Sequence, residues 1–318
     1  MGRGEFEAAR SKAARIALAM RFQSWIKEKW GEEVLWNESL SHHTSWKVGG
    51  PCDLMIFPRN LEELREIVGK ASQEGDSLFV MGRGTNLLVL DGGIRGAVIN
   101  LSRGLKEIVF EGDRVRAGAG ANFPFLAAQA AKRGLSGLEF MGGIPGTVGG
   151  GVKGNAGAFG NSIDQILKRL KMLDWQGQDC VTERKDLEFS YRKSNLPCEG
   201  VIVEAEFGLR EEEPEAIRKK MEDFRKGRSR RQPLQSLTAG SVFKNPPGAH
   251  AGQIIESLGL KGKIVGRAKI SDLHSNFIEN LGGAKAADLV GLIEVIREKA
   301  EKELGLNLEL EVQVVGEK

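Results

Sequence analysis

Glycine-rich loops are the first segments of this sequence that suit chemistry, because backbone N–H groups exposed at glycines bind phosphate oxygens. Two glycine pairs, Gly82-x-Gly84 and Gly118-x-Gly120, each follow a predicted strand, and residues 142–160 hold nine glycines in nineteen positions. Neither pair has the third glycine of a dinucleotide fingerprint, and no glycine loop continues into Gly-Lys-Ser/Thr. Together the three loops predict a site that directs backbone donors at a pyrophosphate.

Other reactive residue types are few and widely spaced. The four histidines are His42, His43, His250 and His274. They lack the spacing of metal ligands, so no metal site is predicted. Three cysteines, an odd number at wide spacing, give no disulfide framework, and a Gly-x-Ser-x-Gly hydrolase elbow is absent. Spacing alone therefore indicates a nucleotide-binding protein and leaves its reaction open.

Composition narrows the class of protein. The chain has 318 residues, enough for two or three domains, and 42 of them are glycine, about 13% against an average near 7%. Forty-six basic and 43 acidic residues give a net charge of +3, which disfavours a nucleic-acid partner. No apolar run is long enough for a membrane span or a signal-peptide core. We therefore predict a cytoplasmic protein with no membrane partner.

Hydrophobic periodicity then supplies the elements that position the loops. Helices are predicted from the N-terminus to Trp30, from the capping residue Asn60 onward, and over residues 123–133, 211–226, 251–258 and 285–304. Strands are predicted over residues 77–81, 97–101, 166–175 and 201–207, with two short strands within 108–120. Strands and helices mix without a sustained βαβ rhythm, so we predict an α+β fold.

The end of the chain has the clearest strand pattern. Over residues 306–315, leucine and valine alternate with polar residues, which predicts a long strand with one buried face. Glu309 and Glu311 fall on the polar face of that strand.

Seven motifs occur in an order typical of one enzyme family. They are HTSWKVGGPCDLMIFP (43–58), GRGTNLLV (82–89), GGIPGTVGGGVKGNAGAFG (142–160), FSYRKS (189–194), TAGSVFKNP (238–246), HSNFIEN (274–280) and LELEVQVVG (308–316). This series closely resembles the UDP-N-acetylenolpyruvoylglucosamine reductase (MurB) family, from about His43 to Gly316. The first 36 residues are not explained by the resemblance.

The resemblance implies a two-subdomain FAD-binding fold of the vanillyl-alcohol-oxidase type with a C-terminal substrate-binding domain. The expected divisions are a helical extension (1–36), two FAD-binding subdomains (37–105 and 106–210) and the substrate-binding domain (211–318). It also implies that NADPH reduces dissociable FAD. Reduced FAD then gives hydride to C3 of the enolpyruvyl group of a UDP-sugar, and an acid protonates C2 to form UDP-N-acetylmuramate. A monomer is expected.

Three catalytic residues follow from matching this sequence to the family motifs. Ser241 of GSVFKNP matches the proton donor, and a well-placed hydroxyl can protonate a strongly basic enolate. Arg192 of FSYRKS matches the arginine that faces the substrate carboxylate, where a guanidinium suits growing negative charge. Glu311 matches the glutamate that orients this array.

The resemblance also implies binding residues. For FAD these are Gly82, Arg83, Gly84, Thr85 and Asn86, with Gly146, Thr147 and Gly149 in a second loop and Asn155 and Ala156 near the flavin ring. For the substrate they are Tyr191, Lys244, Asn245 and Asn276. Arg228 and Arg231 are candidates for phosphate contacts, although a solvated basic run explains them equally well.

One difference from some relatives is plain. Those relatives carry an extra tyrosine-bearing loop that closes over the diphosphate, whereas Tyr191 is the only tyrosine here and about fifty residues separate it from Ser241. The chain therefore resembles the shorter, second type of the family. Two other functions stay open: another FAD-dependent oxidoreductase acting on a hydroxy acid or alcohol, and a flavin- or nucleotide-binding module without catalysis.

Overall fold

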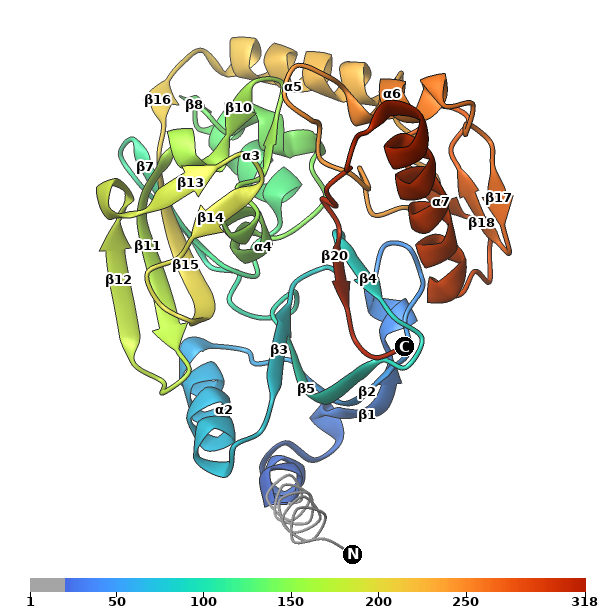
Figure 1. Ribbon diagram of the computed structural model, residues 1–318. Helices are drawn as coiled ribbons and strands as arrows, with labels where there is room; N and C mark the ends of the chain where they lie inside the picture. Colours follow the sequence, from blue (N-terminus) through green and yellow to red (C-terminus); the bar gives the residue numbers. More distant parts are fainter. Residues whose placement is uncertain (1–20) are drawn as a thin grey trace, which may run out of the picture.

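The computed structural model describes residues 21–318, an α+β arrangement in which two separate sheets lie on either side of helix α2 (Leu61–Glu74) and its neighbours (Figure 1). The first sheet has the order β1 (Leu35–Ser39), β2 (Pro51–Ile56), β5 (Ile94–Asn100) and β3 (Leu78–Met81). The β2–β5 and β5–β3 pairs are parallel, and the β1–β2 pair is antiparallel. The loop after β3 carries the first glycine pair.

The second sheet is antiparallel throughout and has five strands. Their order is β12 (Asp179–Glu183), β11 (Leu167–Asp174), β15 (Gly200–Gly208), β7 (Arg114–Gly118) and β6 (Ile108–Glu111). Helices α3 (Phe123–Lys132) and α4 (Val148–Lys153) lie between β7 and β11 in sequence, and a hairpin of β13 (Glu188–Ser190) and β14 (Lys193–Asn195) precedes β15. The glycine-rich run therefore becomes α4 and the loops around it.

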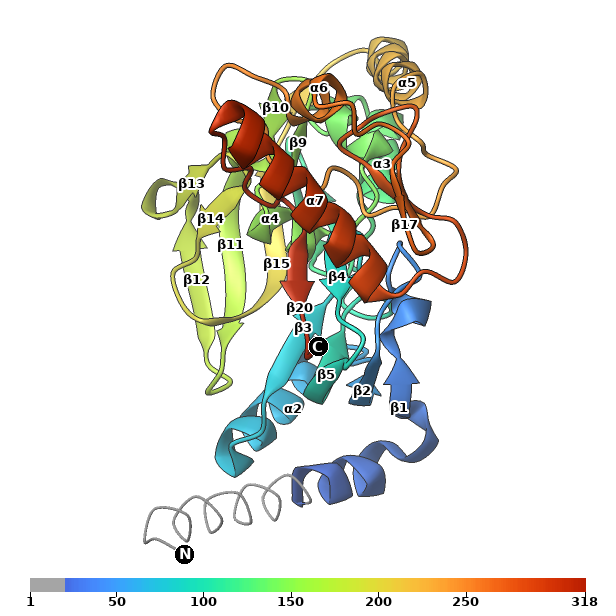
Figure 2. The ribbon, with the colours of Figure 1, turned by 45° about the vertical axis from the view of Figure 1, so that its right-hand side comes forward.

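The C-terminal part is a small unit joined to the first sheet. It contains α6 (Ala251–Ser257), α7 (Ala286–Leu304) and a sheet of β17 (Ile264–Val265), β18 (Ala268–Ile270) and β19 (Ile278–Asn280). Helix α5 (Pro214–Ser229), which precedes this unit, packs instead beside α3, with Met221 and Phe224 against the large core. The last strand, β20 (Gln313–Val315), pairs in parallel with β4 (Leu87–Val89), directly after the first glycine loop (Figure 2). The end of the chain therefore lies beside β4, which belongs to the first half of the sequence.

Buried hydrogen bonds fix this C-terminal unit in place. The Asp91 carboxylate accepts the backbone N–H groups of Ala286 and Ala287 at 2.9 and 3.0 Å, and so caps the start of α7. The indole of Trp46, which is fully buried, donates to the carbonyl of Ile278 at 2.7 Å. These contacts hold the C-terminal unit against the first sheet, so side chains from both can share one site.

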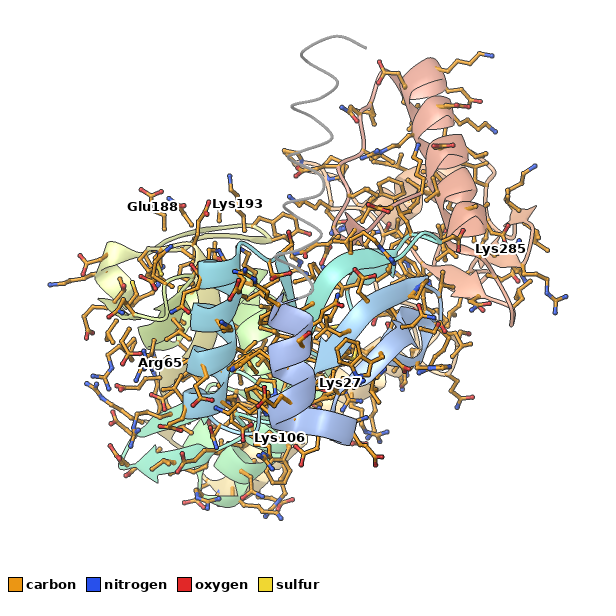
Figure 3. The ribbon with its side chains drawn as sticks, turned by 90° about the horizontal axis from the view of Figure 1, so that it is seen from below. Lys27, Arg65, Lys106, Glu188, Lys193 and Lys285 are labelled. Carbon is orange, nitrogen blue, oxygen red and sulfur yellow. The ribbon has the colours of Figure 1, made fainter. Side chains whose placement is uncertain are left out.

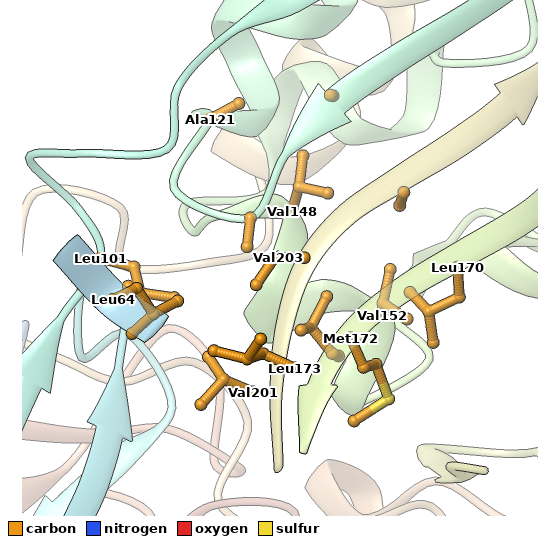
Figure 4. Close-up of a cluster of buried hydrophobic side chains, with 14 of the residues drawn as sticks. Leu64, Leu101, Ala121, Val148, Val152, Leu170, Met172, Leu173, Val201 and Val203 are labelled. Atoms are coloured by element: carbon orange, nitrogen blue, oxygen red, sulfur yellow. The ribbon is translucent and has the colours of Figure 1, made fainter. Parts of the chain in front are cut away.

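A large hydrophobic core joins the N-terminal helix, α2 and the second sheet. Figure 4 shows Leu64 and Leu101 close to Val201, while Val148 and Val152 of α4 pack against the same sheet. A separate core lies under α6 and α7 and includes Trp46 and Leu88 from the first half of the chain. Burying such side chains contributes roughly 1.5–3 kcal/mol each.

Residues 21–30 are helical and belong to the large core. Phe22, Ile26 and Trp30 are buried, while Lys27 is exposed on the outer face of this helix, which lies beside α2 (Figure 3). The predicted N-terminal helix is confirmed for this stretch, and its earlier part lies outside the described residues. Within residues 21–318, no helix has the length and apolar character needed to cross a membrane.

Most predicted elements are confirmed, with one clear error. The expected strand over residues 306–315 is wrong in length: the chain bends at residues 311–312, and only β20 is regular strand. Leu306 and Val314 are exposed although the alternation predicted them to be buried. Leu308 and Val312 both pack into the core under α6 and α7, and the bend between Leu310 and Gln313 breaks the alternation.

The remaining elements are short. They are β8 (Leu135–Ser136) with β16 (Arg210–Glu211), β9 (Gly157–Ala158) with β10 (Asn161–Ser162), and the 3-10 turns η1 (Gly31–Glu33), η2 (Leu40–His43), η3 (Glu139–Gly143), η4 (Ile163–Gln165) and η5 (Arg184–Asp186). Strand β12 and the β13–β14 hairpin were not predicted. The predicted helix over residues 211–226 begins at Pro214 instead, where proline suits the first turn.

Candidate active site

A cavity of about 1000 Å³ lies where the glycine loops meet the C-terminal unit. We call its lining residues from segments 85–86 and 144–159 the glycine wall, and those from 228–256 and 273–277 the C-terminal wall. Arg192 and Glu311 also line the cavity. Its size is at the upper end for small-molecule sites and suits a large ligand or two ligands together.

The clearest polar contact in the cavity joins Arg192 to Glu311. The Arg192 Nε donates to Glu311 Oε1 at 2.6 Å, and its Nη2 donates to the carbonyl of Gly157 at 3.1 Å. Arg192 is 24% exposed and Glu311 19%, so the pair is largely shielded from solvent. A guanidinium held this way can receive a carboxylate of a ligand.

The β13–β14 hairpin positions Arg192 as one of its two turn residues. Arg192 has a φ of +57°, a left-handed conformation that is uncommon for a residue with a side chain. The turn end of the hairpin is bonded to the glycine-rich run, because Asn155 Nδ2 donates to the carbonyl of Ser190 and Ser194 Oγ donates to that of Lys153. Uncommon backbone held by neighbours is typical of functional sites.

Glu311 is held by its backbone on two sides. Its N–H donates to the carbonyl of Val242 at 2.8 Å, and its own carbonyl accepts from Asn86 Nδ2 at 3.0 Å. Burial raises the pKa of the Glu311 carboxyl, although the attraction of Arg192 opposes this rise. The bend at residues 311–312 turns this carboxylate toward Arg192, which a regular strand would not do.

Ser241 lies one residue before Val242, the same residue that Glu311 contacts. The Val242 N–H donates to the carbonyl of Asn276 at 2.8 Å, so the peptide after Ser241 is held from both sides. Within residues 21–318 the Ser241 hydroxyl has no hydrogen-bond partner, and Ser241 lines the cavity. Glu311 thus bonds through its N–H to Val242, the neighbour of Ser241, and through its carboxylate to Arg192. These contacts bring three distant parts of the sequence together.

The two glycine loops contact one another at the glycine wall. Thr85 Oγ1 donates to the carbonyl of Pro145 at 3.0 Å. Gly84 has a φ of +60°, and a Cβ there would lie 2.3 Å from the carbonyl oxygen of His43. Gly146 has a φ of +154° but no atom closer than 3.5 Å to such a Cβ. Gly84 thus permits close backbone packing, whereas a Cβ at Gly146 would make only ordinary contacts, with Thr85 and Phe123.

A group of cationic side chains lines the cavity, and sequence reasoning placed only part of it. The cations are Lys153, Arg192, Arg228, Arg230 and Arg231, and the carboxylates are Glu256 and Glu311. Arg228 packs against Gly143 and donates to Gln232 Oε1 at 3.0 Å, and burial lowers its pKa. The excess of positive charge favours an anionic ligand.

The structure brings ten of the predicted site residues to the cavity. They are Thr85, Asn86, Gly146, Thr147, Ala156, Arg192, Ser241, Asn245, Asn276 and Glu311. The other seven, which do not line it, are Gly82, Arg83, Gly84, Gly149, Asn155, Tyr191 and Lys244.

Two of those seven were expected to contact the substrate and lie elsewhere. Lys244 forms an ion pair with the exposed Glu309, which removes it as a phosphate partner in this arrangement. Tyr191 is 51% exposed, and the Arg192 guanidinium lies 5.0 Å from its ring centre. Tyr191 therefore neighbours the hairpin turn instead of lining the cavity.

Two asparagines and one glycine have structural partners that the motifs did not reveal. Asn276 donates to the carbonyl of Phe243 at 2.8 Å and accepts its N–H at 2.9 Å. Asn155 is buried and braces the hairpin rather than lining the cavity. The Gly149 N–H donates to the carbonyl of Ala119 at 2.9 Å, so this donor is unavailable to a phosphate.

The cavity residues fit a flavin dinucleotide. The hydroxyl of Ser45, beside the first glycine loop, is buried without a partner among residues 21–318. A Cβ at Gly150 would find its nearest neighbour only at 3.7 Å, so this part of the glycine wall is open to a planar group. The cationic side chains balance a diphosphate.

Metal-ligand clusters and reactive thiols are not features of the described chain. Across residues 21–318, no three His, Cys, Asp or Glu side chains lie close enough together to hold a metal ion. Cys52 is fully buried in β2, and burial raises the pKa of its thiol to about 11. It remains a neutral, small buried residue.

Comparisons with known proteins cover nearly the whole chain. Residues 52–182 match the FAD binding domain family, and residues 232–315 match the C-terminal domain of UDP-N-acetylenolpyruvoylglucosamine reductase. The two matches confirm the expected FAD-binding fold followed by a C-terminal domain.

Similar whole proteins are known. The UDP-N-acetylenolpyruvoylglucosamine reductase of Moorella thermoacetica is 44% identical over 95% of this chain and 98% of its own length. That of Bacillus subtilis is 41% identical over 92% of this chain and 97% of its own length. The crystal structure of the Thermus caldophilus enzyme is 38% identical, with a TM-score of 0.78 over 89% of this chain and 98% of that one.

Proposed function

Because the chain belongs to the UDP-N-acetylenolpyruvoylglucosamine reductase family, we propose that it reduces the enolpyruvyl group of that UDP-sugar with electrons from NADPH, giving UDP-N-acetylmuramate for peptidoglycan synthesis. The observation that carries the proposal is the series Ser241–Glu311–Arg192 at one cavity. An acid, a carboxylate and a guanidinium are the groups that this reduction needs.

Arg192 receives the carboxylate of the enolpyruvyl group. Addition of hydride to C3 moves negative charge onto C2 and this carboxylate, so a fixed guanidinium stabilises the transition state more than the ground state. Glu311 holds Arg192 through the 2.6 Å contact, and the hairpin turn keeps the guanidinium oriented before the substrate binds. Glu311 is therefore a positioning residue for Arg192.

Ser241 donates the proton to C2. Its hydroxyl has no protein partner among the described residues, and the neighbouring peptide is fixed by Glu311 and Asn276. A hydroxyl is a weak acid in water, but the enolate beside a carboxylate is a strong base, so geometry decides whether the proton moves.

FAD bound here without a covalent bond would supply the hydride-transfer chemistry between NADPH and the substrate. We propose that the glycine wall holds it, with Thr85, Asn86, Gly146, Thr147 and Ala156 at the cavity and Gly82, Arg83, Gly84, Gly149 and Asn155 supporting their loops. NADPH and the UDP-sugar then use the remaining space in turn, as two successive half-reactions require.

Further parts of the proposal concern organisation. We propose that residues 1–36 form an extension, residues 37–105 and 106–210 the two FAD-binding subdomains, and residues 211–318 the substrate domain, in a monomer located in the cytoplasm. Strand β20 returns to β4, so the last residues of the substrate domain also complete the FAD side. Asn245, which accepts the Ala251 N–H at 3.0 Å, would then sit beside the UDP-sugar with Asn276 holding the Ser241 loop.

A product assay tests the proposal. The FAD-loaded protein is incubated with NADPH and UDP-N-acetylenolpyruvoylglucosamine, and the product is identified by mass spectrometry. We expect NADPH oxidation that depends on the UDP-sugar and a product heavier by two hydrogen atoms. NADPH oxidation without that product, or flavin reduction by hydroxy acids instead of NADPH, would overturn the proposal in favour of another oxidoreductase.

A further inference from the structure

The first glycine loop ends in an asparagine that bonds to the last segment of the chain. Asn86 Nδ2 donates to the carbonyl of Glu311 at 3.0 Å, and the Asn86 carbonyl accepts the N–H of Gln313 at 2.9 Å. One residue of the glycine wall therefore holds the chain on both sides of the bend at residues 311–312.

Both backbone polar groups of Glu311 are bonded, each to a different part of the molecule. Its N–H donates to the carbonyl of Val242, next to Ser241, at 2.8 Å, while its carbonyl accepts from Asn86. Val312, which follows directly, is 3% exposed and packs into the core under α6 and α7. These anchors fix the direction in which the Glu311 side chain leaves the backbone.

That direction decides how Glu311 meets Arg192. Glu311 Oε1 accepts from Arg192 Nε at 2.6 Å, and the guanidinium also donates to the carbonyl of Gly157 at 3.1 Å. A hydrogen bond weakens steeply when its angle departs from linear. A small rotation of the Glu311 backbone would therefore loosen the ionic contact that orients the guanidinium.

An amide side chain suits this task at position 86. Asparagine carries an N–H donor for the Glu311 carbonyl, whereas an aspartate of nearly the same size only accepts hydrogen bonds when ionised. Alanine has no donor and would leave the carbonyl without this partner. The backbone contact between residues 86 and 313 does not depend on the side chain, so a substitution removes the Glu311 contact selectively.

We propose that Asn86 is a positioning residue for Glu311, whose carboxylate it directs toward Arg192 by bonding to the Glu311 carbonyl. The first glycine loop is thereby connected to the groups that act on the substrate. The inference rests on the proposed function, because its effect is measured on the reaction with the UDP-sugar. Asn86 acts through Glu311 and takes no part in proton transfer.

The experiment is a double-mutant cycle on the reoxidation of reduced flavin by UDP-N-acetylenolpyruvoylglucosamine. It compares FAD-loaded wild type, Asn86→Ala, Glu311→Gln and the double variant. We expect Asn86→Ala to slow reoxidation about 5-fold, as for the loss of one neutral hydrogen bond. In the Glu311→Gln background the same change should have an effect of less than about 2-fold, because the carboxylate that Asn86 positions is already gone.

Thr85→Ala is the matched control. Thr85 precedes Asn86 in the same loop and lines the cavity, but its hydroxyl donates to the carbonyl of Pro145. Its effect on reoxidation should therefore be equal in both backgrounds. Flavin reduction by NADPH should have the same rate in wild type and Asn86→Ala, because that step does not use Glu311.

A crystal structure supplies a readout that does not depend on activity. In the FAD-loaded Asn86→Ala protein, the Glu311 carboxylate should be displaced from Arg192 Nε. An unchanged contact between these two residues would overturn the inference.

The kinetic outcomes separate this inference from the proposed function. If reduced wild type is not reoxidised by the UDP-sugar, the proposed function is overturned, together with any role of Asn86 in it. If wild type is reoxidised but Asn86→Ala slows the step equally in both backgrounds, only the inference is overturned. A parallel loss of flavin reduction by NADPH would show that Asn86 serves the FAD site alone, and would also overturn it.

Discussion

The two walls of the cavity are built in different ways. On the glycine wall, Thr85 bonds to Pro145, and directly behind that wall Gly149 bonds to Ala119 and the buried Asn155 to the hairpin. On the C-terminal wall, by contrast, Ser241 and Ser275 have hydroxyls without protein partners among residues 21–318.

Most of the cavity's cations without an ion pair lie on the C-terminal wall, although Lys153 on the glycine wall also has no ion-pair partner among residues 21–318. Arg230 and Arg231 on the C-terminal wall form no ion pair with any described residue, although 23 ion pairs occur elsewhere in residues 21–318. Because the unpaired donors gather on the C-terminal wall, we expect the substrate to make its polar contacts there. Apart from Asn86, which acts through Glu311, the glycine wall should tolerate loss of a donor in the substrate reaction, and the C-terminal wall should not.

The largest expected effect concerns Ser241. In Ser241→Ala, turnover should fall about 10²–10⁴-fold, the range for losing a positioned acid. FAD content and the rate of flavin reduction by NADPH should match wild type, because neither step uses this hydroxyl. Normal turnover in stopped-flow and steady-state assays would remove Ser241 as the proton donor.

Removal of the Arg192 guanidinium should have the next largest effect. Arg192→Ala is expected to slow reoxidation of the flavin by the UDP-sugar about 10²–10³-fold, as for other donors at developing negative charge. Arg192→Lys should recover only part of the rate, since lysine lacks the fork that binds a carboxylate and Glu311 together. Equal rates in all three proteins would place the carboxylate elsewhere.

Glu311 gives the pH dependence of the same step. Its ionised form holds Arg192, and burial raises its pKa above the ordinary value of 4.5. The reoxidation rate should therefore fall on acidification through this raised pKa, at higher pH than an exposed glutamate would require. In Glu311→Gln the rate should be about 10-fold lower at neutral pH, and this acid limb should disappear. An unchanged acid limb in that variant would assign it to another group.

A substitution at Arg231 tests whether the cations without ion pairs contact the substrate phosphates. Tyr191 is the only tyrosine in the sequence, and residues 230–234 line the cavity. Arg231→Ala should raise KM for the UDP-sugar about 10-fold with little change in kcat, because a phosphate contact acts equally in ground and transition states. High salt should reduce the difference between the variant and wild type. If Arg231→Ala has the same KM as wild type, Arg231 is a solvated basic residue with no phosphate contact.

The smallest effect is expected at Lys244. Its partner Glu309 is 73% exposed, and the pair lies outside the cavity lining. An exposed ion pair contributes about 0–1 kcal/mol, so Lys244→Ala should change KM and melting temperature only slightly. A rise in KM as large as that of Arg231→Ala would indicate that Lys244 contacts the diphosphate.

Local sequence signals predicted most of the fold. Asn60 accepts the Glu63 N–H at 2.9 Å and begins α2 as its capping pattern indicated, and Gly134 follows α3 with a φ of +69°. The prediction of a long terminal strand failed because the chain bends at residues 311–312, where Glu311 bonds to Val242 and Gln313 to Asn86, and such long-range partners leave no local pattern. The family resemblance itself is confirmed by relatives of 44% and 41% identity.

The site residues were predicted by motif, and the resemblance implied that Glu311 orients the array, but the backbone link to Ser241 was not predicted. Ser241, Glu311 and Arg192 were each assigned from their motifs, yet their linkage through Val242 depends on tertiary structure alone. The resemblance implied that Asn276 contacts the substrate, and the structure adds that its amide bonds to the backbone of Phe243, which the HSNF motif did not reveal. Phe159, which has a φ of +55° and stacks on Phe224 at 4.4 Å beside the cavity, gave no signal in the sequence.

The most direct test of the central claim is an anaerobic visible spectrum of the FAD-loaded wild-type protein, recorded after NADPH and again after UDP-N-acetylenolpyruvoylglucosamine. We predict that NADPH bleaches the flavin absorbance and that the UDP-sugar restores it, so that both half-reactions occur at this one cavity. Bleaching that the UDP-sugar does not reverse would contradict the assignment of the C-terminal wall to this substrate. A protein that takes up no FAD would contradict the assignment of the glycine wall.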